Sequence, residues 1–522
     1  MRTSLTRFFA PLFLALFISA PALATATSAG INWRDAANDG DIARAFAQAK
    51  TESKPVLLYW GATWCPPCNK LKATLFNRQD FIAQSRAFVA VHVDGDLPSA
   101  QKLGTRFKVT GYPTMILMNA SGTEITRLPG EVESAQIINA LNLALAGGRP
   151  AKALLEDVRA NKPLSENEWR TLAFYSWETD EAQLVSAEAR PQLFADLATA
   201  SQQANAEVAT RLWLKAVAAR DGKSTVKSLG TMESRRKTFS ELLANPSKVH
   251  QHLDMLVNYA GDLVRQTSDA NSTERAQLVV AYNAALLGLQ NDAALARADQ
   301  VDALAARIEL ARIEQAETAI QVSLPAALQK ELSDASARLD RDISNGYERQ
   351  AVIPTVAFVL GRAGLWKESD ELLKASLAKS ISPYYLMSSL GSNAKKQGRN
   401  DEALTWYGKA WNTSVGPATR LQWGATYVMA LVDLAPDDAA KITATATQIF
   451  TEAGKDSGAF HQRSARSLTR IADKLATWNT ADVHKTELTK ITAQIGGLCK
   501  RLPAKDPQKA SCAEVLAKAS KT

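Results

Sequence analysis

Cysteine and histidine are scarce in this chain, which has four cysteines and five histidines among 522 residues. So few cysteines exclude a small scaffold that is held together by many disulfides. The sequence also contains no nucleotide-, flavin- or metal-binding motif, and no cluster of histidines and cysteines has the spacing of zinc ligands. We therefore expect the protein to act without a metal ion and without a bound cofactor.

Long apolar runs are also scarce, and the clearest one stands at the start of the sequence. Arg2 and Arg7 precede an apolar run over residues 8–18, and a small-x-small motif ends at Ala24. Because the run is short for a bilayer span, it predicts a signal peptide over residues 1–24 rather than a transmembrane anchor. No cysteine lies near the expected cleavage site, which excludes a bacterial lipid anchor. We expect an exported chain without a membrane anchor, in a Gram-negative periplasm or otherwise secreted.

Charge of one sign is not concentrated in blocks. The net charge is +8 and the pI is about 9.1, but the excess of basic residues is scattered, so an exported chain of this kind is not expected to bind nucleic acid. Arg463, Arg466 and Arg470 would share one face of a helix. A solvated helix face is the simpler interpretation of these arginines, and a site for an anion or an acidic partner is the alternative.

The most informative motif is Trp64-Cys65-Pro66-Pro67-Cys68. It follows an apolar run that predicts a buried strand, and it precedes a helical pattern. The first cysteine would then lie at a helix N-terminus, where the dipole and free N–H groups favour a thiolate, with the second cysteine one turn away. A redox dithiol is the leading interpretation. A zinc site is the main alternative, but it needs two further ligands at matching spacing.

The remaining cysteines, Cys499 and Cys512, are spaced to close a short helix-turn-helix loop. In an oxidising compartment we expect them to form a structural disulfide. A loop of that size contributes about 3 kcal/mol in the chain-entropy model. The alternative is a second redox pair that exchanges with the first.

The first part of the sequence alternates between helical and strand patterns. The pattern predicts helices over residues 41–50 and 132–146, a helix after the Cys-x-x-Cys motif, and strands over residues 56–60, 88–93, 114–118 and 124–128. This order is typical of a mixed sheet that helices cover on both faces.

Residues 147–150 read as a linker, after which proline and glycine become sparse and alanine and leucine abundant. We therefore place an α/β domain over residues 25–148 and an all-α domain over residues 149–522. Residues 364–369 recur as residues 398–403, an offset of 34 residues that is the tetratricopeptide period. The expected helical domain is a tetratricopeptide-like solenoid, with its clearest repeat over residues 360–412. Residues 151–350 could be an irregular solenoid or a separate bundle.

Residues 31–146 resemble the thioredoxin family, including secreted members such as the C-terminal domain of the periplasmic transmembrane disulfide reductase. The resemblance is carried by residues 54–68, by Gly111-Tyr112-Pro113-Thr114 and by the glycines that follow at family spacing, Gly122 and Gly130. The Pro-Pro dipeptide between the cysteines is similar to that of tryparedoxins and nucleoredoxins. The resemblance implies a thioredoxin fold over about a quarter of the chain.

The resemblance also implies roles for individual residues. Cys65 would be the exposed nucleophile, Cys68 the resolving thiol, and Trp64 a neighbour that flanks the site. Because no cofactor motif is visible, electrons would have to come from, or go to, a thiol of another protein.

Three further residues would contact substrate. Pro113 would follow a cis peptide bond and lie against the disulfide, and the Tyr112 backbone would pair with a substrate strand. Gly130 would let substrate approach closely. An ordinary trans turn proline and a plain turn glycine are the alternatives for Pro113 and Gly130.

The chain departs from the family six residues before the nucleophile, where Tyr59 replaces a buried acid. That acid is thought to assist deprotonation of the resolving cysteine. The Tyr59 hydroxyl or an ordered water could substitute for it. His92, on a neighbouring strand, is more simply a strand histidine than a base.

The two prolines set the redox character that we expect. Pro66 and Pro67 remove two N–H donors from the first helical turn, so a Cys65 thiolate would rely mainly on the Cys68 N–H. Lys70 is the nearest cation along the chain and could point away. We expect a moderately lowered Cys65 pKa and a reducing couple.

The leading functional prediction is a periplasmic thiol–disulfide oxidoreductase that reduces or exchanges protein disulfides. Its partners would be protein thiols and disulfides and an upstream electron-donor protein. The helical domain would recruit a partner or substrate on a concave face, an expectation that rests on fold analogy. The alternatives are a helical-repeat scaffold with a redox-sensing domain, and a disulfide isomerase.

Overall fold

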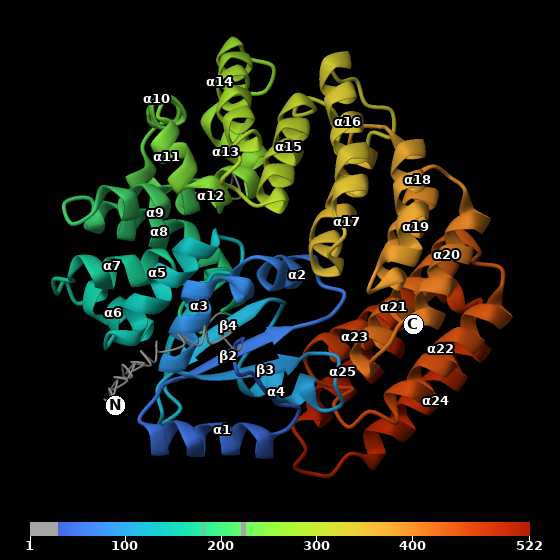
Figure 1. The fold of residues 1–522 in the computed structure, drawn as a ribbon. Coiled ribbons are helices and arrows are strands. Elements are labelled where there is room, and N and C mark those ends of the chain that lie inside the picture. Colours follow the sequence, from blue (N-terminus) through green and yellow to red (C-terminus); the bar gives the residue numbers. More distant parts are fainter. Residues whose placement is uncertain (1–29, 181–182, 221–225, 522) are drawn as a thin grey trace, which may run out of the picture.

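The computed structural model describes residues 30–180, 183–220 and 226–521 (Figure 1). The predicted signal peptide lies outside the described residues. The structure has an α/β part over residues 34–145, followed by a helical part over residues 151–519. None of the helices in the described ranges is long and apolar enough to cross a membrane.

A five-stranded sheet in the order β1-β3-β2-β4-β5 forms the centre of the α/β part. Strands β1, β3 and β2 are parallel to one another, and β4 and β5 are antiparallel to their neighbours. The strands are β1 (Arg34–Asp35), β2 (Val56–Gly61), β3 (Val89–Asp94), β4 (Thr114–Met118) and β5 (Glu124–Leu128). The predicted strands are present, and β1 is a two-residue strand that the sequence pattern did not predict.

Helices cover both faces of this sheet. They are α1 (Asp39–Glu52), α2 (Pro66–Ala73), α3 (Gln79–Gln84), α4 (Ala100–Arg106) and α5 (Ser134–Leu145). Leu58 and Trp60 of β2 pack in one apolar cluster with α1 and α4, whereas Leu57 and Tyr59 pack in another with α2, α3 and α5. Because successive strand residues point to opposite faces, one fully buried strand supplies both cores.

Every element that the structure describes after β5 is helical. The α-helices are α6 (Ala151–Arg159), α7 (Glu166–Ala173), α8 (Arg190–Ser201), α9 (Ala206–Ala218), α10 (Met232–Leu243), α11 (Pro246–Gln251), α12 (Leu253–Asn258), α13 (Ala260–Thr267), α14 (Thr273–Gln290), α15 (Arg297–Ala311), α16 (Ala326–Asp342), α17 (Gly346–Arg362), α18 (Trp366–Ser376), α19 (Pro383–Lys396), α20 (Asn400–Thr413), α21 (Pro417–Leu434), α22 (Ala439–Ala453), α23 (Gln462–Trp478), α24 (Lys485–Arg501) and α25 (Gln508–Ala519). Short 3-10 turns are η1 (Leu75–Asn77), η2 (Ser85–Ala87), η3 (Trp177–Thr179), η4 (Ala187–Ala189), η5 (Lys227–Leu229), η6 (Leu377–Lys379) and η7 (Thr480–Asp482).

The helical part curves around the α/β part. In Figure 1 the helices follow one another from α6 on the left, across the top, to α24 on the right, and the sheet lies on the inner side of this arc. Helix α17 lies against α2, and α23 lies against α4. The concave side of the arc therefore lies against the chain's own α/β part, and recruitment of a partner by the helical part stays a prediction.

The 34-residue repeat corresponds to two similar helical hairpins, α17–α18 and α19–α20. Each hairpin turns at a glycine with positive φ, Gly364 (80°) and Gly398 (72°), a conformation that glycine adopts without strain. The backbone hydrogen bond after each glycine is also repeated, from Leu365 to Leu360 and from Arg399 to Ala394, both at 2.9 Å. The tetratricopeptide-like solenoid stays a prediction.

Cys499 and Cys512 form a disulfide between α24 and α25, with a sequence separation of 13 residues. Cys512 is completely buried, in the apolar cluster of the C-terminal helices.

Candidate active site

The Cys-x-x-Cys motif lies at the junction between β2 and α2. Cys65 is the N-cap residue of α2, and its Sγ accepts a hydrogen bond from the Cys68 backbone N–H at 3.2 Å. Pro66 and Pro67 occupy the first positions of the helix, where a missing N–H group breaks no intrahelical bond. The Cys68 N–H, which the sequence predicted as the main donor to Cys65, thus does donate to the Cys65 sulfur.

Cys65 and Cys68 form a disulfide with a Cα–Cα distance of 5.3 Å. Cys68 is 0% exposed and Cys65 only 2% exposed. The expectation of an exposed Cys65 is therefore wrong for this closed structure. Cys65 packs with Ala62, Cys68, Trp64 and Tyr112, and helix α17 of the helical part lies against α2, the helix that Cys65 caps.

The peptide bond between Tyr112 and Pro113 is cis, as the family resemblance implied. Gly130 packs directly on the proline ring, since a Cβ atom at Gly130 would lie 2.7 Å from Pro113 Cγ. The Tyr112 hydroxyl accepts a hydrogen bond from Gln101 Nε2 at 2.8 Å. Gly130 therefore has a packing role against Pro113, whatever substrate it also admits.

Tyr59 stands at the position of the missing acid and is buried in the sheet. Its side chain is 1% exposed, and burial, together with the charge of Asp94, raises the pKa of its hydroxyl. Among the described residues that hydroxyl has no hydrogen-bond partner. His92 stacks on Tyr59 at 5.3 Å, and its Nδ1 lies 2.9 Å from Asp35 Oδ1, as a satisfied strand histidine.

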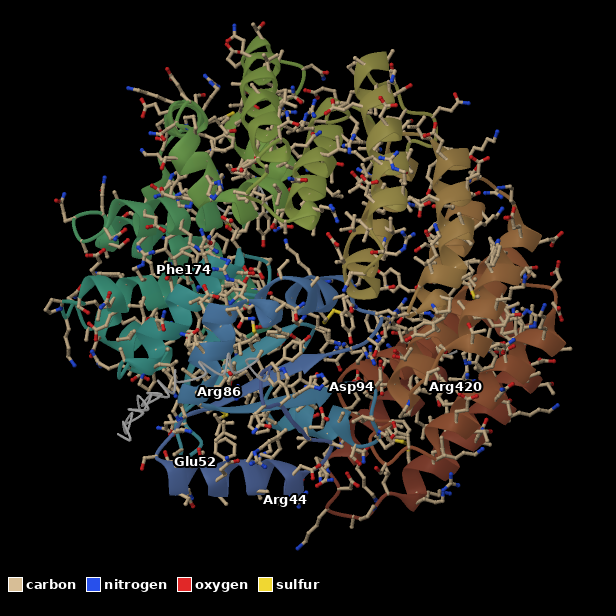
Figure 2. The ribbon with its side chains drawn as sticks, in the orientation of Figure 1. Arg44, Glu52, Arg86, Asp94, Phe174 and Arg420 are labelled. Carbon is tan, nitrogen blue, oxygen red and sulfur yellow. A yellow bond between two sulfur atoms is a disulfide. The ribbon has the colours of Figure 1, made fainter. Side chains whose placement is uncertain are left out.

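Asp94 is one of two acidic residues near the motif that sequence reasoning missed, the other being Asp96. Asp94, which is labelled in Figure 2, is the last residue of β3. It pairs in register with Gly61, the last residue of β2. Burial raises the pKa of the Asp94 carboxyl, and a hydrogen bond from the Asp96 backbone N–H partly offsets this rise. The signal was available, because the carboxyl ends of adjacent parallel strands lie side by side, and the residue that ends β3 therefore lies beside the segment leading to Cys65.

Residues 42–145 match the family model described as a thioredoxin-like domain. This segment is a thioredoxin-like domain. It is 32% identical over 98 residues to the thiol:disulfide interchange protein DsbD 2 of Pseudomonas aeruginosa, covering 18% of this chain and 17% of that protein. It is 28% identical over 101 residues to the disulfide bond reductase DsbH of Chlamydia pneumoniae, covering 16% of this chain and 58% of that protein. The chain thus spans between about a sixth and somewhat over half of the length of these relatives.

A solved thioredoxin from Thermus thermophilus is 24% identical to this chain, with a TM-score of 0.20, and the match covers 22% of this chain and 86% of the thioredoxin.

Trp64 of the thioredoxin-like domain contacts several side chains of the helical part. The Trp64 ring stacks on Tyr385 at 6.1 Å and lies 5.5 Å from Trp423. Its indole N–H lies 3.0 Å from both Asp96 Oδ2 and Thr419 Oγ1. Trp64 flanks the disulfide, as predicted, but its ring is inserted between side chains of the helical part.

Gln350 of α17 contacts the backbone of the motif. Its Nε2 donates to the Trp64 carbonyl oxygen at 2.8 Å, and its Oε1 accepts from the Ser380 hydroxyl at 3.1 Å. Gln350 is 2% exposed. Both ends of this amide are therefore satisfied, and it fixes α17 against the residue that precedes Cys65.

Arg463 of α23 lies over the two aromatic residues beside the site. Its guanidinium lies 5.1 Å from the centroid of the Trp64 ring and 5.2 Å from that of Tyr112, and it forms an ion pair with Asp96. Its side chain is 13% exposed. The solvated helix face predicted for the arginines is thus wrong for Arg463, and Arg466 also reaches the thioredoxin-like domain, donating to the Thr110 carbonyl at 2.8 Å.

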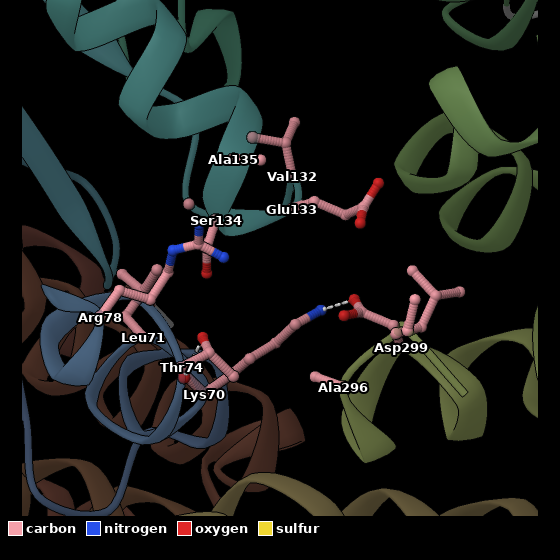
Figure 3. A pocket seen from close by; sticks show the side chains of 13 residues that line it. Lys70, Leu71, Thr74, Arg78, Val132, Glu133, Ser134, Ala135, Ala296 and Asp299 are labelled. Atoms are coloured by element: carbon pink, nitrogen blue, oxygen red, sulfur yellow. Dashed lines mark hydrogen bonds and ion pairs between the residues drawn. The ribbon is translucent and has the colours of Figure 1, made fainter. Parts of the chain in front are cut away.

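Lys70 points away from the cysteines, toward α15. Its Nζ lies 2.5 Å from Asp299 Oδ1 and 3.4 Å from Asp302 Oδ2. Figure 3 shows this ion pair beside a cavity of about 280 Å³ between α2, the start of α5 and the start of α15. Gly130 lines the cavity, so it reaches the edge of the site where Pro113 lies.

No group of three or more His, Cys, Asp or Glu residues in the part of the chain that the structure describes could hold a metal ion.

Proposed function

We propose that this protein is a thiol–disulfide oxidoreductase that reduces or exchanges protein disulfides through Cys65 and Cys68. The observation that carries the proposal is the Cys65–Cys68 disulfide at the N-terminus of α2, with the Cys68 N–H on the Cys65 sulfur. The cis bond before Pro113 and the similarity of residues 42–145 to proteins named for thiol:disulfide interchange add support.

The reaction needs only the two cysteines and a partner. In the reduced protein, the Cys65 thiolate attacks one sulfur of a substrate disulfide, forms a mixed disulfide and displaces the other substrate sulfur as a thiolate. The Cys68 thiolate then attacks Cys65 Sγ and releases the second substrate thiol. Two electrons pass from the dithiol to the substrate, and a protein dithiol upstream must return them.

The local structure supports a reducing couple. Pro66 and Pro67 leave the Cys68 N–H as the donor to Cys65 Sγ, so a thiolate gains less from the helix N-terminus than in an ordinary first turn. The charge of Arg463 is balanced by Asp96. Because a poorly stabilised thiolate disfavours the reduced form, we expect a reduction potential of about −270 mV. A value of about −120 mV would contradict this assignment.

We propose that the chain acts in the periplasm and that residues 149–522 form a separate domain that recruits its partner. The signal-like segment over residues 1–24 supports export, and the break between α5 and α6 at residues 146–150 supports the boundary. Cell fractionation of the tagged full-length chain tests the location. Recovery in the cytosol would contradict it.

Trapping of mixed disulfides tests the function. In the full-length chain, Cys68→Ser removes the resolving thiol, so Cys65 should hold substrate proteins in covalent complexes that a reductant releases. The double variant Cys65→Ser/Cys68→Ser is the matched control and should hold none. If Cys68→Ser holds no more protein than the control, the chain does not turn over disulfides, and a scaffold is the better interpretation.

A further inference from the structure

We propose that the helical part is an autoinhibitory cover, and that the Cys65–Cys68 disulfide exchanges with a protein thiol only after this cover opens. The inference rests on the proposed function and adds a control of access to it. The contact surface that must open is called the seam. One side is formed by α2, α4, the start of α5, Trp64, Tyr112 and the loop of residues 95–99, and the other by α15, α17, α21, α23 and the loop of residues 454–461.

The seam blocks the route that a protein partner needs. Exchange requires a thiolate to reach one sulfur of the disulfide, and here Cys65 is 2% and Cys68 0% exposed. Gln350 donates a hydrogen bond to the Trp64 carbonyl oxygen, and the Arg463 guanidinium lies over the rings of Trp64 and Tyr112. The helical part therefore covers the surface that a substrate strand needs beside Tyr112.

Besides the aromatic packing of Trp64 on Tyr385 and Trp423, the seam contains several polar contacts, which make it suited to opening in water. The Trp64 indole N–H donates to Thr419 Oγ1 at 3.0 Å, and Asp96 accepts the Thr419 hydroxyl and pairs with Arg463. Further contacts join Ser99 to Ser457 at 3.0 Å. Water can replace each of these interactions when the two sides separate, and interfaces between domains of one chain commonly permit relative motion.

The seam is also incompletely packed. The cavity of about 280 Å³ separates α2 and the start of α5 from α15, and charged side chains of both signs line it, including Lys70, Arg78, Glu133 and Asp299 (Figure 3). Because this space is not filled by side chains, less apolar surface is buried between the two sides of the seam, and the closed state gains less free energy from burial.

A chemical bridge across the seam tests the proposal. Ser99 and Ser457 have hydroxyl oxygens 3.0 Å apart, are 358 residues apart in sequence, and are outside the cluster of residues that packs with the two cysteines. In the full-length variant Ser99→Cys/Ser457→Cys, dibromobimane would join the new cysteines through thioethers that reductants do not cleave. The native disulfides stay oxidised during this step, so their sulfurs are not alkylated. The control is the same variant capped with monobromobimane at both cysteines.

The measurement is the rate at which reduced thioredoxin, a protein dithiol, reduces the Cys65–Cys68 disulfide, read by mass spectrometry of the peptide that carries Cys65. Because the rate follows the fraction of open molecules, the bridged protein should react about tenfold or more slowly than the capped control. Dithiothreitol, a small reductant, should discriminate less between the two proteins.

Equal rates of reduction by thioredoxin in the bridged and capped proteins would overturn the proposal. This result is separate from the failure of the proposed function, because the rate measures only access to the disulfide. Failure of the proposed function would appear instead as an absence of trapped substrate in Cys68→Ser, whether or not the bridge slows thioredoxin.

Discussion

Replacing Asp299 by asparagine should open the seam and speed the reaction at the disulfide. Lys70 lies two residues after Cys68, and its ammonium is 2.5 Å from Asp299 Oδ1. The side chains are only 13% and 6% exposed, so the ion pair is largely removed from water in the closed structure. Asp299→Asn leaves the lysine charge in place and removes the carboxylate closest to it.

The magnitude follows from the cost of a buried charge that has lost its partner, about 3–5 kcal/mol. We take the lower value, about 3 kcal/mol, because Asp302 remains near Lys70 and the lysine is not completely buried. The penalty applies to the closed state alone, since opening returns Lys70 to water. At 1.4 kcal/mol for each factor of ten, the equilibrium shifts about 100-fold toward the open state.

Asp302→Asn is the matched control. Its carboxylate lies farther from the ammonium, at 3.4 Å, and its side chain is 32% exposed. Burial raises the pKa of Asp302 although Lys70 opposes the shift, so this carboxylate holds its charge less firmly. We expect Asp302→Asn to raise the opening equilibrium by less than Asp299→Asn.

The assay is the rate of reduction of the Cys65–Cys68 disulfide by reduced thioredoxin, measured for the wild type and both variants at one pH and salt concentration. The expected order is Asp299→Asn fastest, then Asp302→Asn, then wild type. Circular dichroism must show that each variant is folded. If folded Asp299→Asn reacts no faster than the wild type, the Lys70 ion pair does not hold the cover closed and the reasoning is refuted.

Three further predictions concern single features of the fold. Tyr59→Phe removes a buried hydroxyl without a partner among the described residues, so insulin reduction should stay within about twofold of wild type and stability should hold or rise by about 1 kcal/mol; a large loss of insulin reduction would make the hydroxyl part of the reaction. His252 is buried, and burial with the charge of Arg211 lowers its pKa to about 4, so the folded state holds the neutral ring. In the unfolded chain His252 takes up a proton below its ordinary pKa of about 6.5, so the free energy of unfolding is highest above that pH and falls by about 3 kcal/mol as the pH approaches 4. Urea unfolding of His252→Phe across this range should lack that decrease, and an equal decrease in wild type and variant would contradict the assignment. Cys499→Ser/Cys512→Ser should cost about 3 kcal/mol in thermal or urea unfolding while insulin reduction persists, and a loss of insulin reduction in folded protein would favour a second redox pair.

Local structure was largely predictable. Apolar runs and alternation predicted four of the strands, and the Cys-x-x-Cys spacing predicted a cysteine at a helix N-terminus with Cys68 N–H as its donor. The cis bond before Pro113 came from the family resemblance. These features depend on residues within a turn or a strand pair, where propensity, pleat and missing N–H groups act directly. The sequence by itself therefore determined the chemistry that the site can carry.

Access to that chemistry was decided by the tertiary structure. The residues of the helical part that contact the surroundings of Cys65 are far away in the sequence: Gln350 is 286 residues from Trp64, and Arg463 is 367 residues from Asp96. No period or motif encodes such a pairing, because it depends on how the curved row of helices meets the sheet. For the same reason, an arginine that the helical pattern placed on a solvated face lies instead over Trp64 and Tyr112, next to the redox disulfide.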